Sequence, residues 1–182
     1  MFHSPFGPKV LEVDCPEEIV NAINLYVEYG DYDLSIFPNL LNRDFPNIFL
    51  PREFCEEIGL TSFIEMCGVE YLKENLELPD VEFDGRLYKD CWVNRYTEHH
   101  LTPVHTHDGL LSGILFLKTL PVDDTLRGVL EFIFGESNDY CFDRWRPEQI
   151  ERKVLLFPSW LKHCVYPTQS LSERRTMSFN LR

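Results

Sequence analysis

The sequence is short of positive charge: 17 lysines and arginines stand against 30 aspartates and glutamates, giving a formal net charge of −13. A surface of this sign repels the phosphates of DNA, RNA and anionic membranes unless a basic patch focuses the field. The two basic runs, Arg144-Trp145-Arg146 and Arg174-Arg175, are too short to form such a patch. We therefore expect no membrane partner, and the charge disfavours a nucleic-acid substrate.

Long apolar runs and paired cysteine motifs are also missing. No segment approaches the ~18 uninterrupted apolar residues of a transmembrane helix, and the first residues lack the basic and apolar regions of a signal peptide. The six cysteines form no CxxC pair and no zinc-type spacing. We expect reduced, mostly buried thiols in a cytoplasmic protein, within the host cytoplasm if a phage encodes it.

The apolar content, 44% of 182 residues, is sufficient for the core of one domain. Apolar residues recur at helical spacing over about 16–29 and again from about 52 to 75, with a break near Gly59. Asp14 is the expected N-cap of the first helix, and Gly30 is expected to end it. The first ten residues are predicted to form an arm or an edge strand, with a short strand at 10–13.

From residue 81 the pattern changes to short β-rich runs separated by turn residues. These runs cover 87–97, 103–107, 110–118, 128–134, 152–157, 163–166 and 174–181. Short, regularly spaced strands are typical of a sandwich or barrel, and helices followed by strands indicate an α+β, mainly β protein. We expect one domain over 1–182, in which a helical region at 1–80 supports a β core at 81–182. Residues 136–147 are predicted to form a long loop that is either a lid or a surface connection.

Three histidines give the strongest functional signal. His105 and His107 lie two residues apart in a predicted strand, where side chains of such spacing share a face. His163 lies at the start of a later predicted strand. Neutral imidazole suits iron, copper, nickel and zinc, and three ligands from two strands leave open positions on a metal ion. The pattern therefore predicts a mononuclear metal centre.

The last predicted strand carries polar residues on one face. Side chains alternate along a strand, so Arg174 and Arg175 point to opposite faces. If the face of Arg174 is the inner one, its guanidinium can bind a carboxylate with two hydrogen bonds. If it is the outer one, Arg174 lies in water. By the same alternation, the residues that share the face of Arg174 are Thr176, Ser178 and Asn180.

The segment from about residue 94 to residue 181 resembles the 2-oxoglutarate/Fe(II) oxygenases with an HxH motif, a group found in bacteria and tailed phages. The matching parts are 92–94, 103–107, 111–113, 128–132, 155–163, Arg174 and 178–180. The resemblance implies a double-stranded β-helix, or jelly roll, with N-terminal helices packed on one sheet. It also implies Fe(II) and 2-oxoglutarate as cofactors of a dioxygenase that hydroxylates a small-molecule or peptidyl substrate.

The resemblance assigns roles to individual residues. His105 and His163 match the two ligand histidines of the superfamily. Arg174 matches the arginine that binds the distal carboxylate of 2-oxoglutarate. The residues expected to contact the cosubstrate beside it are Asn94, Tyr96 and Ser178.

One position departs from the pattern of the superfamily. Where most members carry Asp or Glu two residues after the first histidine, this chain has His107. The third ligand is then His107, or Asp108 reaching in at the end of the strand, or water. Two other functions stay open at this point: a cupin-like jelly roll that binds a small molecule or a protein without catalysis, and a three-histidine iron dioxygenase that uses no 2-oxoglutarate. The sequence is also compatible with a homodimer.

Overall fold

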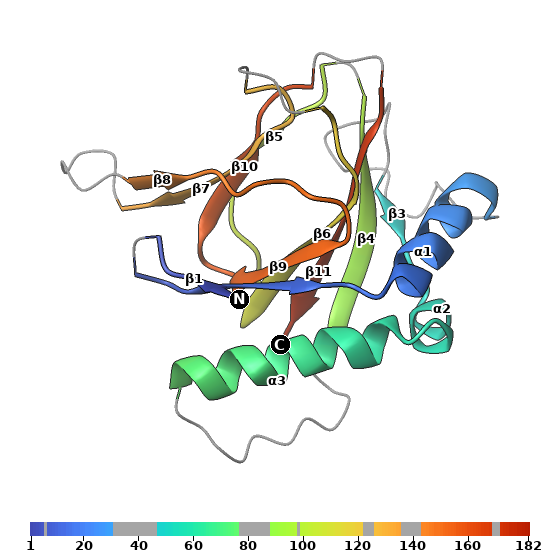
Figure 1. Cartoon of the computed structure of the whole chain (residues 1–182), viewed down its shortest axis with the longest axis horizontal. Coiled ribbons are helices and arrows are strands. Elements are labelled where there is room, and N and C mark those ends of the chain that lie inside the picture. The colour runs from blue at the N-terminus through green and yellow to red at the C-terminus, as the bar shows by residue number, and fades with distance from the viewer. Residues whose placement is uncertain are drawn as a thin grey trace.

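The computed structural model describes residues 1–5, 7–30, 47–76, 88–97, 99–121, 126–135, 143–168 and 172–182. Within these ranges lie helices α1 (Glu17–Tyr29), α2 (Arg52–Glu57) and α3 (Leu60–Leu76), followed in sequence by most of the strands (Figure 1). Among the residues so described, no helix is both long enough and apolar enough to cross a membrane.

The described strands form two antiparallel sheets. In spatial order, the major sheet comprises β1 (Phe2–His3), β2 (Val10–Asp14), β9 (Lys153–Pro158), β6 (Leu111–Lys118), β11 (Arg174–Leu181), β4 (Tyr88–Tyr96) and β3 (Ile48–Phe49). The minor sheet comprises β5 (Thr102–His105), β10 (Lys162–Val165), β7 (Leu130–Phe134) and β8 (Asp143–Trp145). The minor sheet lies across from the major one in Figure 1, which is the jelly-roll arrangement.

A hydrophobic core joins the two sheets. The major sheet contributes Ile114, Phe116 and Phe157, and the minor sheet contributes Leu130 and Phe132, all of them buried. The rings of Phe132 and Phe157 meet edge to face with their centroids 4.8 Å apart. This packing fixes the position of the minor sheet relative to the inner face of β6 and β11, so that side chains from both sheets can meet in one site.

The helices cover the other face of the major sheet, as the family resemblance implies. Ile23 of α1 and Ile64 of α3 belong to one buried cluster with Met177 and Phe179 of β11. Gly113 on the neighbouring strand lies under the Phe179 ring, where an added Cβ would come within 2.0 Å of a ring carbon. The tight cluster on this face leaves the opposite face of β11 for polar side chains.

Most of the predicted helices and strands are confirmed, but the predicted N-cap is wrong and two short strands are not predicted. Asp14 does not cap α1: it ends β2, and one of its carboxylate oxygens accepts a hydrogen bond from Lys153 Nζ at 3.2 Å. The residue before the helix is Pro16, which makes no side-chain cap. The sequence also misses β3 and β8, because strands of two and three residues are too short to show an alternating pattern.

Strand β8 includes Arg144 and Trp145, which lie in the region predicted to be a loop. The Trp145 ring stacks on Phe132 at a centroid distance of 5.5 Å, so this end of the predicted loop is part of the minor sheet. Residues 136–142 lie outside the described residues, and so does Cys141. Of the other five cysteines, all but Cys164 are buried, as expected.

Candidate metal centre and carboxylate site

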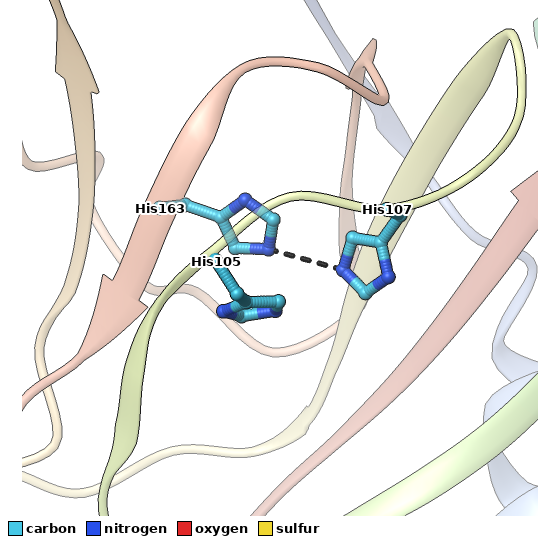
Figure 2. Close-up of side chains that lie close together, drawn as sticks. All are labelled: His105, His107 and His163. Atoms are coloured by element: carbon cyan, nitrogen blue, oxygen red, sulfur yellow. Dashed lines mark hydrogen bonds between the residues drawn. The ribbon is translucent and has the colours of Figure 1, made fainter.

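Three histidine side chains converge at the edge of the minor sheet (Figure 2). Strand pairing places His105 of β5 directly opposite His163 of β10. The Nε2 atoms of His107 and His163 lie 3.2 Å apart, and one ring nitrogen from each of the three residues lies within 4.8 Å of the others. Two nitrogens bound at ~2.1 Å to one metal ion, at right angles to each other, would lie ~3 Å apart. The arrangement therefore suits a shared metal ion.

His107 reaches this cluster by a different route from the predicted one. Strand β5 ends at His105, so the two residues do not share a strand face. The backbone N–H of His107 instead donates to the Ser159 carbonyl at 2.9 Å, and its ring lies 5.8 Å from that of Trp92. This backbone hydrogen bond holds the segment beyond β5 so that the His107 side chain turns toward His163.

Backbone carbonyls fix the orientation of the other two rings. Nδ1 of His105 donates to the Pro103 carbonyl at 2.8 Å, and Nδ1 of His163 donates to the Leu161 carbonyl at 2.9 Å. A neutral imidazole that donates through Nδ1 presents the lone pair of Nε2, which is the arrangement usual in metal-binding histidines. Two of the three rings are thus held with Nε2 toward the common site, and the donor set fits a divalent metal ion.

Burial keeps His163 in the form that binds metal. Its side chain is buried, and this burial, followed by repulsion from His105 and His107, lowers the pKa of His163 to about 3. A metal ligand must be deprotonated, and His163 is neutral at any pH well above that value. Asp108 is exposed, and among the described residues the metal-type cluster consists of the three histidines without it.

A cavity of about 500 Å³ opens beside the histidines. Its described lining runs from Asn47 and Trp92 past the histidine cluster to Tyr96 and Arg174. No aspartate or glutamate occurs among these described lining residues, although the chain as a whole carries a net charge of −13. The permanently charged side chains in this described lining are Arg95 and Arg174, and such cations favour anionic ligands.

Arg174 also lines this cavity and is 1% exposed. Its guanidinium lies over the Tyr96 ring, 4.8 Å from the centroid, and 5.9 Å from the centroid of Phe116. Nε and Nη2 donate to Gln149, whereas Nη1 is buried and has no hydrogen-bond partner within the described part of the chain. Burial lowers the pKa of Arg174, yet a guanidinium stays protonated in proteins. A buried cation with an unused donor is the partner that a ligand carboxylate needs.

The expected cosubstrate contacts also line the cavity. Asn94 donates through Nδ2 to Ser178 Oγ at 2.9 Å and accepts at Oδ1 from Trp92 Nε1 at 3.1 Å. The Tyr96 hydroxyl is 2.8 Å from Thr102 Oγ1. One of these bonds lies within β4 and the others join β4 to β11 and to β5, so the direction of each polar group is fixed before any ligand enters.

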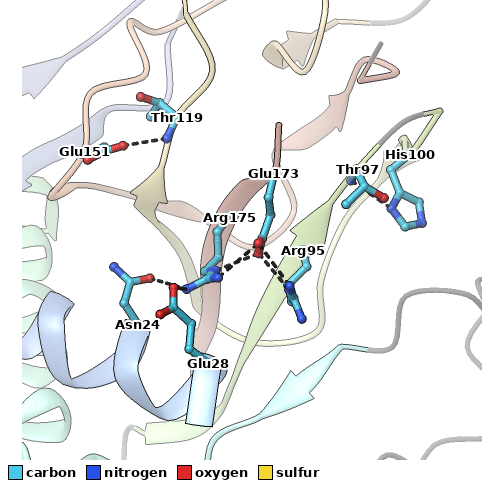
Figure 3. A network of polar contacts seen from close by, with 9 residues as sticks. All are labelled: Asn24, Glu28, Arg95, Thr97, His100, Thr119, Glu151, Glu173 and Arg175. Carbon is cyan, nitrogen blue, oxygen red and sulfur yellow. Dashed lines mark hydrogen bonds and ion pairs between the residues drawn. The ribbon is translucent and has the colours of Figure 1, made fainter. Parts of the chain in front are cut away.

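Arg175 points to the opposite face of β11, as the alternation predicts, but that face is not solvated. Its Nε donates to Glu173 at 2.8 Å and its Nη1 to Asn24 at 2.8 Å, and the side chain is 3% exposed (Figure 3). Glu173 also accepts from Arg95 of β4 at 2.8 Å. Arg175 therefore joins α1 to the major sheet, while Arg174 lines the cavity on the other face.

Sequence reasoning misses Gln149, the hydrogen-bond partner of Arg174. It lies in an irregular segment between β8 and β9, where no periodic pattern assigns a direction to a side chain. Only the known position of Arg174 in three dimensions identifies it.

Comparison with known proteins gives one family match. The model of a family described as "Putative 2OG-Fe(II) oxygenase" matches residues 90–180, half of the 182-residue chain. This span contains all three histidines and Arg174. No curated protein matches the chain.

Several solved structures share the fold. A prolyl-4-hydroxylase of Pseudomonas putida is 14% identical with a TM-score of 0.65, over 95% of this chain and 91% of that one. SnoN, a non-heme α-ketoglutarate-dependent epimerase from nogalamycin biosynthesis, is 12% identical with a TM-score of 0.65, over 95% and 77%. A prolyl hydroxylase of Trichoplax adhaerens, solved with a hypoxia-inducible-factor peptide fragment, is 13% identical with a TM-score of 0.58, over 94% and 82%. At such identities the likeness shows the fold alone, and it confirms the double-stranded β-helix.

Proposed function

Because the chain belongs to the 2-oxoglutarate- and Fe(II)-dependent oxygenase family, we propose that it hydroxylates a C–H bond of a small-molecule or peptidyl substrate. Family membership favours this over a cupin-like module without catalysis and over a dioxygenase that uses no 2-oxoglutarate. The observation that carries the proposal is the unused donor of Arg174 in the same cavity as the three imidazoles.

We assign His105, His107 and His163 as the protein ligands of Fe(II). Each offers a ring nitrogen to a common point, and the carbonyl bonds at Nδ1 hold two of them in the binding tautomer. When bound, Fe(II) and 2-oxoglutarate supply the oxidising chemistry, in which dioxygen is consumed and the cosubstrate leaves as succinate and carbon dioxide. All other contributions come from the chain.

Arg174 binds the distal carboxylate of 2-oxoglutarate in this proposal. Its buried charge and free Nη1 favour a dianion over a neutral ligand. Asn94 and Ser178 line the same cavity and limit the orientations open to the cosubstrate. The aromatic rings of Tyr96 and Phe116 keep water from the guanidinium, which strengthens the ion pair.

The proposed class of substrate, a small molecule or a peptide, is supported by proteins that share the fold. Proteins of this fold include two prolyl hydroxylases, one of them solved with a peptide, and an epimerase from nogalamycin biosynthesis. Both peptidyl and small-molecule substrates are therefore compatible with the fold. We further propose that the enzyme works in the cytoplasm, which the mostly buried cysteines and the lack of paired cysteine motifs support.

An anaerobic titration tests the function directly. Fe(II) and 2-oxoglutarate added to the protein should give a charge-transfer absorption band, and Arg174→Ala should abolish it at the same ligand concentration. Succinate release should then be screened over a panel of metabolites and peptides. A protein that binds Fe(II) but gives no band with 2-oxoglutarate would contradict the proposal.

A further inference from the structure

We propose that Gln149 is a positioning residue that orients Arg174 and, being neutral, leaves the charge of the arginine for the cosubstrate. This inference rests on the proposed function, since it takes the distal carboxylate of 2-oxoglutarate as the partner of Arg174. It adds a residue outside the strands of the jelly roll and gives a reason for an amide, rather than a carboxylate, at that position.

The hydrogen bonds show how Gln149 holds the guanidinium. Its Oε1 accepts from Arg174 Nη2 at 2.7 Å and from Nε at 3.2 Å. Its Nε2 donates to the Gly128 carbonyl at 3.2 Å, which determines which end of the amide is the oxygen. With two of its three nitrogens fixed on one oxygen, the guanidinium keeps Nη1 as its unused donor.

Packing reinforces this orientation. Gly128 has a φ of +64°, and a Cβ built on it would lie 3.2 Å from Arg174 Cδ and 3.1 Å from Thr168 Cγ2. The glycine backbone therefore comes close to the aliphatic part of Arg174 while its carbonyl holds Gln149. The Tyr96 ring lies beside the guanidinium. Arg174 is confined by its neighbours, so its unused donor has a defined direction.

The two neighbouring arginines differ in the charge of their partners. Arg175 pairs with the Glu173 carboxylate at 2.8 Å, so its charge is balanced within the protein. The hydrogen-bond acceptor of Arg174 is an amide oxygen, which orients the cation without balancing it. A buried cation without a counter-ion lowers the stability of the protein. An anionic ligand that supplies the counter-ion therefore binds with higher affinity. A carboxylate at position 149 would instead compete with the cosubstrate.

The test compares Gln149→Glu with wild type and uses two ligands. The ligand 2-oxopentanoate has the keto-acid end and chain length of 2-oxoglutarate but a methyl group in place of the distal carboxylate. Dissociation constants of both are measured by absorption titration of the anaerobic Fe(II) protein. Gln149→Glu should weaken 2-oxoglutarate binding by about 10-fold or more and leave 2-oxopentanoate binding unchanged. Its melting temperature without cosubstrate should equal or exceed that of wild type.

Asn24→Asp is the matched control, because Asn24 is the amide that accepts from Arg175 on the other face of β11. It adds the same charge beside an arginine but should leave 2-oxoglutarate binding unchanged. Gln149→Leu removes the acceptor. It should weaken the binding of 2-oxoglutarate and leave the binding of 2-oxopentanoate unchanged. If both Gln149 variants lose affinity for the two ligands equally, the role of Gln149 is merely structural and the inference is overturned.

Arg174→Met separates this inference from the proposed function. If Arg174→Met binds 2-oxoglutarate as wild type does, the carboxylate assignment itself is wrong. If Arg174→Met loses 2-oxoglutarate but keeps 2-oxopentanoate, while Gln149→Glu binds both normally, only the role of Gln149 is refuted.

Discussion

A single imidazole distinguishes this site from the carboxylate-containing site usual in its superfamily. A carboxylate would cancel one charge of Fe(II), whereas His107 does not, and no acidic residue occurs among the described residues that line the cavity. On the proposed assignment of His107 as the third ligand, the remaining charge of Fe(II) is left for anionic ligands to balance, and 2-oxoglutarate brings two negative charges.

We expect His107→Ala to lower the affinity for Fe(II) by more than the ~10–100-fold that removal of an outer partner typically costs. Asp108→Ala should keep most of the affinity, since Asp108 is exposed and outside the cluster. His107→Asp should retain iron, because it restores the usual carboxylate. Anaerobic iron titration measures all three, with His105→Ala and His163→Ala as reference variants that bind almost none. Strong binding by His107→Ala together with weak binding by Asp108→Ala would reverse the assignment.

Substitution of Arg174 should affect cosubstrate binding, whereas substitution of Arg175 should affect the stability of the fold. Arg174→Ala should weaken 2-oxoglutarate binding by roughly 2–5 kcal/mol, the cost of breaking a buried charge pair. Arg175→Ala should leave that affinity unchanged but reduce the free energy of unfolding by about 3 kcal/mol, because Glu173 loses its most buried partner. Urea unfolding of both variants gives the free energy of unfolding, and ligand titration gives the affinity for 2-oxoglutarate. A larger loss of cosubstrate affinity in Arg175→Ala would contradict the strand register.

At the scale of elements, Glu173 joins β11 to β4 through Arg95 and to α1 through Arg175, which also binds Asn24 (Figure 3). Burial alone would raise the pKa of Glu173, but the hydrogen bonds from Arg95 and Arg175 outweigh it and lower the pKa to about 2. The folded state therefore binds the proton less readily than the unfolded state does. The stabilisation is complete above the ordinary value of 4.5 and is lost as the pH falls toward 2.

The pH dependence of Glu173→Gln measures this contribution. We expect the free energy of unfolding of wild type to exceed that of the variant at pH 6, and the difference to shrink steadily between pH 4.5 and pH 2. Urea unfolding at a series of pH values gives both curves. A difference that is constant over this range would show that the carboxylate is not the titrating group.

The strands show which parts of the site can be predicted from sequence. Alternation along 174–181 correctly separates the inner Arg174 from the outer Arg175, because period 2 is a property of any extended chain. It says nothing of what covers the outer face, so the burial of Arg175 under α1 was not predictable. His107 reaches its place through a backbone bond to Ser159, and Gln149 through an irregular segment. Contacts between residues far apart in sequence and outside regular strands leave no periodic signal.

At the scale of the whole molecule, the N-terminal region completes the β core. Strand β2 pairs with β9, and β3 with β4, so residues from the first 80 belong to the major sheet. Residues of α1 and α3 bury the outer face, including Met177 and Phe179. The covered face lies directly behind the strand that carries Arg174. We propose on this basis that 1–182 is one domain in which the helical region is required for the site.

Truncation tests the single-domain proposal. The full chain should unfold in one cooperative transition that fluorescence and circular dichroism report at the same denaturant concentration. A fragment of residues 81–182 should fail to fold, because exposing each large side chain such as Met177 or Phe179 costs about 1.5–3 kcal/mol, and two strands lose their partners. The typical stability of a domain is only about 5–15 kcal/mol, so a few such losses suffice. A fragment that folds and binds Fe(II) with the affinity of the full chain would show instead that the jelly roll stands alone and that the helices serve another purpose.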